Sequence, residues 1–191
     1  MNKIILYLVA LLVCSSCESV GMFAKKEATK EEYKYYNKEF VLPAGSLLKT
    51  NGIYVKSTLE KFEYSKKNYD KYYKNNPHPA IGNNVPKNDT IIQYYRWYYY
   101  KFSNTGQWMT SGGFYSKENM LKDVKNFEKE GDYSIYKINN DIVEMESYNW
   151  YRKDFTYQTA KLKGDTLYVR GGTSTENQQV NGVPYIFYPM N

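Results

Sequence analysis

Two glutamates on one expected strand are the residues of this chain whose types and spacing come nearest to a catalytic pair. Glu144 and Glu146 lie two positions apart in "DIVEMESYNWYR" (141–152), so both side chains point to the same face of a strand. Their Cβ atoms would lie about 6.5–7 Å apart, near the carboxyl separation of inverting glycosidases, although every such strand pair has this spacing. The usual alternation of a half-buried strand instead predicts that Val143 and Met145 fill the core and that both glutamates face solvent.

His78 is the only histidine, and it lies between two prolines in "NPHPA", within a polar, proline-rich segment (66–89) that we expect to be a long loop. A catalytic or metal-binding histidine needs partners within reach, and no His, Cys or Asp cluster shows metal-ligand spacing. The glycine pairs Gly112-Gly113 and Gly171-Gly172 lack the lysine of a phosphate-binding loop and indicate bulges or bends. The sequence therefore predicts no enzyme, no cofactor and no metal site.

The N-terminus has the pattern of an export signal. A single lysine, Lys3, precedes the apolar run from Ile4 to Val13, which as a helix is too short to be a permanent span. "CSSC" (14–17) follows, with small residues directly before Cys17. This stretch resembles the lipobox of bacterial lipoproteins, although Cys14 stands where Leu or Val is usual. The alternatives are an ordinary signal peptide and a buried N-terminal helix with a cysteine pair.

The resemblance implies that residues 1–16 are removed as a signal peptide and that Cys17 becomes the lipidated, palmitate-bearing N-terminus, anchored stably in a membrane. Glu18, where Asp would favour inner-membrane retention, implies the outer membrane, on its periplasmic or surface face. The Tyr-, Asn- and Lys-rich composition is similar to that of uncharacterised lipoproteins of the Bacteroidota. We expect residues 17–38 to be a polar tether and residues 39–191 to be the folded domain.

Charge excludes one class of partner. The formal net charge is +6, but there is no basic cluster, and the only arginines are Arg96, Arg152 and Arg170. This pattern argues against nucleic-acid binding, which exported proteins also rarely need.

The elements that must position these residues are mostly strands. Alternating segments joined by turns such as Asn139-Asn140 and Gly164-Asp165 favour an antiparallel meander over any βαβ scheme. One helix is expected after Ser116, in "KENMLKDVKNFEKE". We expect an all-β fold: an up-and-down barrel of eight or nine strands with one helix, similar to the lipocalin-like barrels of small bacterial lipoproteins. The expected strands cover residues 50–57, 59–65, 90–103, 107–116, 132–138, 141–152, 155–163, 166–172 and 183–189.

Aromatic residues are the remaining signal, since the chain has 23 tyrosines and the strand at 90–103 reads "TIIQYYRWYYYKFS". One face of that strand must be core, and the other needs a partner, because Tyr and Trp suit both a pleated core and a ligand-stacking surface. The sequence predicts a non-enzymatic, membrane-anchored envelope lipoprotein that binds a small apolar or glycan ligand at the barrel mouth. The alternative is an accessory subunit of an outer-membrane protein complex. The candidate ligand-binding residues are Tyr95, Trp97, Tyr99, Trp108 and Trp150.

Overall fold

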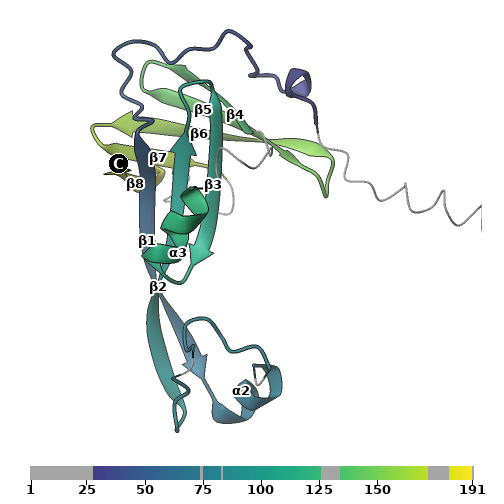
Figure 1. Ribbon diagram of the computed structural model, residues 1–191, viewed down its shortest axis with the longest axis vertical. Helices are drawn as coiled ribbons and strands as arrows, with labels where there is room; N and C mark the ends of the chain where they lie inside the picture. Colours follow the sequence, from purple (N-terminus) through teal and green to yellow (C-terminus); the bar gives the residue numbers. More distant parts are fainter. Residues whose placement is uncertain (1–27, 74, 83, 126–133, 172–180, 191) are drawn as a thin grey trace, which may run out of the picture.

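Eight antiparallel strands close into one barrel in a computed structural model of the chain, which describes residues 28–73, 75–82, 84–125, 134–171 and 181–190 (Figure 1). Each strand pairs with the next in sequence, and the last pairs with the first, so the prediction of an all-β, up-and-down barrel is confirmed. The strands are β1 (Gly52–Tyr64), β2 (Thr90–Phe102), β3 (Gln107–Phe114), β4 (Ser134–Asn139), β5 (Ile142–Asn149), β6 (Asp154–Lys163), β7 (Thr166–Arg170) and β8 (Val183–Pro189).

The helices differ more from expectation. The predicted helix is α3 (Lys117–Val124), and it begins where expected, because Ser116 Oγ accepts a hydrogen bond from the Asn119 N–H. The expected continuation to 130 lies largely outside the described residues. The prediction of one long loop over 66–89 was wrong at its start, where α2 (Lys66–Tyr72) forms. A 3₁₀ turn, η1 (Lys30–Glu32), precedes the barrel.

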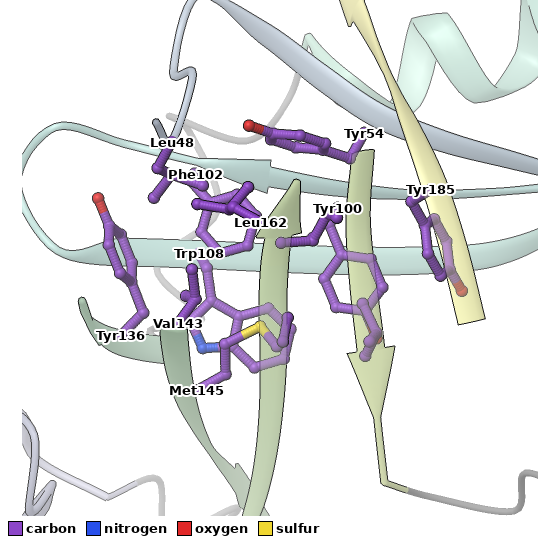
Figure 2. Close-up of a cluster of buried hydrophobic side chains, with 13 residues drawn as sticks. Leu48, Tyr54, Tyr100, Phe102, Trp108, Tyr136, Val143, Met145, Leu162 and Tyr185 are labelled. Atoms are coloured by element: carbon purple, nitrogen blue, oxygen red, sulfur yellow. The ribbon is translucent and has the colours of Figure 1, made fainter. Parts of the chain in front are cut away.

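The barrel interior is packed with side chains. In Figure 2, aromatic and aliphatic residues from facing strands fill the space between the walls. Trp108 is 3% exposed, and its indole N–H lies 3.0 Å from the Ile135 carbonyl oxygen and 3.2 Å from that of Glu146, so the polar atom of this core residue is paired. The buried cluster comprises Leu48, Tyr54, Tyr100, Phe102, Trp108, Tyr136, Val143, Met145, Ala160, Leu162, Leu167, Val169 and Tyr185.

The strands β1 and β2 continue beyond the barrel as a two-stranded ribbon, drawn at the bottom of Figure 1. β3 pairs with β2 only from Trp97 onward, and β8 pairs with β1 only up to Val55, which leaves the far halves of β1 and β2 paired with each other. The segments predicted as two strands, 50–57 and 59–65, are therefore one. α2 covers this ribbon by burying Tyr69 against Tyr64, with ring centroids 5.1 Å apart.

The last residues of the predicted tether contact the barrel wall. Glu146 of β5 is fully buried, and its two carboxyl oxygens accept the backbone N–H groups of Lys34 and Tyr35 at 3.1 and 2.9 Å. Val143 and Met145 point into the core as predicted, and Glu144 lies on the outer face beside Lys137 at 2.9 Å. The expectation that Glu146 faces solvent was wrong, because residues 33–35 cover it.

Candidate functional site

The aromatic strand β2 divides its side chains between two faces, as the alternation predicts. Tyr100 lies in the barrel core, whereas Tyr99 lies on the outer face, fully buried beside Met120 and Val124 of α3. α3 therefore covers part of the outer wall over β2.

The five predicted ligand-binding residues do not form one site. Tyr95 and Trp97 are outer-face neighbours with ring centroids 6.5 Å apart, and Tyr95 is 54% exposed. Tyr99 is covered by α3, and Trp108 is inside the filled barrel. Trp150 lies at the β5–β6 turn, beyond the end of β5, although it was predicted to be on the strand. Of the five, Trp97 lines a concave surface.

That surface is a groove of about 460 Å³ on the outer wall, over β1 and between β8 and the start of α3. It exists because Tyr185 and Phe187 point toward the core, so their neighbours Ile186 and Tyr188 point outward. Ile186 pairs with Val55 and is 64% exposed. The groove is lined by Val55, Lys56, Ser57, Trp97, Lys117, Pro184, Ile186, Phe187 and Tyr188.

The groove offers ring surfaces and one well-placed cation. The indole of Trp97 and the ring of Tyr188 are flat apolar surfaces suited to stacking. Lys117, the first residue of α3, places its Nζ 4.0 Å from the centroid of the Tyr188 ring. The titratable side chains of the lining are Lys56, Lys117 and Tyr188.

Sequence reasoning identified Trp97 and missed the other walls of the groove. The pattern that could have indicated these walls is in the last strand, "VPYIFYP". There Ile186 and Tyr188 share one face, and Tyr185 and Phe187 share the other. The register in which this strand pairs with β1, which brings Ile186 beside Val55, was not predicted.

A second cluster, polar and aromatic, lies where the inner face of the ribbon meets the barrel. Glu60 accepts hydrogen bonds from the hydroxyls of Tyr94 and Tyr98 at 3.0 and 3.2 Å, and the Arg96 Nη1 lies 3.7 Å from the same carboxyl group. The guanidinium also lies over the ring of Tyr115, at 5.1 Å.

The only histidine completes this cluster. His78 stacks on Phe62 with ring centroids 4.1 Å apart, and burial together with the charge of Arg96 lowers the pKa of His78. Gly113 makes room for the guanidinium, since a Cβ there would overlap Arg96. Most of these polar groups pair with one another, which indicates that the cluster has a structural role in connecting the barrel and the ribbon.

Among the residues that the structure describes, no group of three or more His, Cys, Asp or Glu side chains is placed to hold a metal ion. Within the same ranges, no helix has both the length and the apolar character needed to cross a bilayer.

Comparison with known proteins returned no match: no family model matches the chain, and no curated protein and no solved structure is significantly similar to it.

Proposed function

We propose that this protein is a non-enzymatic lipoprotein of the cell envelope, anchored in the outer membrane through Cys17, that holds a small apolar or glycan ligand in the groove beside Trp97. The observation that carries the proposal is the groove itself: an open, mostly apolar site on the outer wall of a barrel whose interior is already filled. Its volume of about 460 Å³ is in the range of small-molecule sites.

The lining favours a ligand with a flat apolar face and a polar or anionic end. Trp97 and Tyr188 offer ring faces, and Ile186 and Val55 add aliphatic contact. The ammonium group of Lys117 lies over the Tyr188 ring, where it can pair with an anionic or hydroxyl-rich group. A sugar ring with a charged substituent and a short amphiphile both meet this description.

The experiment that tests the groove is native mass spectrometry of the full mature protein, gently extracted from its own host. We expect a small mass to co-purify. The variant Ile186→Ser removes a wall side chain that is 64% exposed and so leaves the fold intact, and it should lose that mass. Ile91→Ser is the matched control, because Ile91 is 59% exposed on β2 and does not line the groove. A bound mass kept in both variants, or absent from the wild type, would refute the assignment.

A second candidate function, docking of an envelope protein, is favoured by one further observation. The exposed apolar residues Leu59 and Tyr95 pair across β1 and β2 on the outer face of the ribbon, next to Trp97. Exposed apolar surface of this kind is typical of interaction sites. In the same spectra, a protein partner that Ile186→Ser or Tyr95→Ser displaces would support docking instead of small-ligand binding.

A further inference from the structure

The turn between β5 and β6 carries two large aromatic rings into solvent. Trp150 is 43% exposed and Tyr151 is 78% exposed, and their rings are stacked with centroids 3.6 Å apart. Asn149 Oδ1 accepts the backbone N–H groups of Tyr151 and Arg152, both at 3.1 Å, which fixes the shape of the turn. We call residues 150–153, "WYRK", the hairpin tip.

The hairpin tip lies on the side of the barrel that residues 33–35 contact. Tyr33 is buried with its ring edge-on to Phe155, at 5.0 Å, and Phe155 pairs with Tyr148 directly below the tip. In Figure 1 the β5–β6 hairpin extends toward the same side as η1, the short purple helix.

The proposed anchor is close enough to bring this side to a membrane. Residues 18–27 separate Cys17 from the first described residue, Ala28. Ten residues span about 35 Å when fully extended, and about 17 Å as the root-mean-square distance of a flexible chain. Because residues 33–35 are held on the wall by Glu146, the described part of the predicted tether adds no further slack.

The chemistry of the tip matches the boundary between lipid and water. Trp and Tyr concentrate there because each ring has an apolar body and a polar edge. Arg152 and Lys153 follow directly, and cationic side chains are attracted to anionic headgroups. Asp154 lies 3.7 Å from Arg152 and offsets one of the two positive charges.

We propose that the hairpin tip is a second membrane contact, which places Trp150 and Tyr151 at the interface of the anionic lipid leaflet that holds the Cys17 anchor. This inference rests on the lipid anchor of the proposed function.

Tryptophan quenching by lipid tests the contact. The acylated full-length mature protein is reconstituted into vesicles of three parts phosphatidylethanolamine and one part phosphatidylglycerol, with or without brominated acyl chains. The chain has 3 tryptophans, of which Trp108 is buried in the core and serves as an internal reference. We expect brominated lipid to quench the wild type. In Trp150→Phe the quenching should fall by more than half, whereas in the matched control Trp97→Phe it should persist. Exchanging phosphatidylglycerol for neutral phosphatidylcholine should weaken it.

Three results would overturn the contact: equal quenching in wild type and Trp150→Phe, no quenching in any form, or quenching that is lost in Trp97→Phe instead. Cross-linking of Tyr151→Cys to a protein in host envelopes, without quenching by lipid, would assign the tip to a protein partner. The intact mass of the purified protein separates the two proposals. A chain without acyl groups on Cys17 would refute the anchor and the contact together, whereas an acylated chain without Trp150 quenching would refute the contact alone.

Discussion

The variant Glu146→Gln should release the N-terminal segment from the barrel wall without unfolding the barrel. In the wild type both carboxyl oxygens of Glu146 accept backbone N–H groups, from Lys34 and Tyr35. A glutamine amide retains one acceptor oxygen and presents an NH₂ group to the other N–H. One hydrogen bond to a charged group is lost, which costs about 1.5–3 kcal/mol of docking free energy.

Hydrogen exchange of individual amides measures this loss directly. The N–H groups of Lys34 and Tyr35 are protected only while the segment is docked, so their exchange should accelerate by roughly 10- to 150-fold in Glu146→Gln. The amides of the barrel strands should keep their wild-type rates. Trp108 should also keep its environment, because its indole contacts the backbone carbonyl of Glu146 and not the side chain.

Glu144→Gln is the matched control. Glu144 lies on the same outer face two residues away, and its carboxyl group accepts a long hydrogen bond, 3.4 Å, from the Tyr35 hydroxyl, which the amide oxygen of a glutamine can also accept. Its ion pair with the half-exposed Lys137 is worth about 1 kcal/mol or less. Exchange at Lys34 and Tyr35 should change little in this variant. Unchanged exchange in Glu146→Gln, or equal acceleration in the two variants, would show that the buried carboxyl group does not hold the segment.

Gly113, His78 and a buried tyrosine give three more tests. Gly113 has φ 83°, and Gly113→Ala should lower the denaturation midpoint more than the control Gly164→Ala, since both incur about 1–2 kcal/mol of backbone strain but only the first places a Cβ against Arg96. Because the pKa of His78 is lowered from 6.5, the unfolded chain protonates first, and the melting temperature should fall as pH drops below 6.5; His78→Gln should lose this slope. Burial raises the pKa of Tyr185 from 10.0 to about 12, so the unfolded chain loses this proton first. The free energy of unfolding should therefore fall by about 1.4 kcal/mol per pH unit from this group between pH 10 and 12, which alkaline unfolding followed by tyrosinate absorbance measures and which Tyr185→Phe should lack.

The barrel was predictable because several of its strands are joined by tight turns. Gly164, with φ 56°, and Asp165 form the two-residue turn expected between β6 and β7. Asn140, with φ 54°, likewise takes the left-handed conformation expected of an Asn-Asn turn. Where turns of this kind join alternating strands, sequential pairing is the simplest arrangement, and the structure has it throughout.

The helix that sequence reasoning missed, α2, depends on tyrosines. A sequence pattern does not show clearly whether a tyrosine is a core residue or a loop residue. In α2 the only buried residue is Tyr69, and Tyr73, one turn later, stacks on it at 5.3 Å. Both tyrosines were interpreted as loop residues among lysines and asparagines. Their i,i+4 spacing was the available signal for a short helix.

The site was only partly predictable, because the two faces of β2 are alike in composition. Alternation correctly separates Tyr99 from Tyr100, but sequence does not say that α3 covers Tyr99 and leaves Trp97 beside a groove. The burial of Glu146 was hidden for a related reason. Its partners, Lys34 and Tyr35, lie more than 100 positions away in the chain, so no local pattern marks it as buried.

The seam between β8 and β1 has a consequence for how the protein is made. Gly52–Val55 pair with Ile186–Pro189, so this edge of β1 stays unpaired until β8 has been synthesised. Until then, the barrel part of β1, which carries Ile53 and Val55 on its outer face, has an unpaired backbone edge open to pairing with other chains. Closing so long a loop is entropically unfavourable and slows folding. Truncation before β8 leaves this edge of β1 permanently unpaired, so the truncated chain should aggregate more readily than the full one.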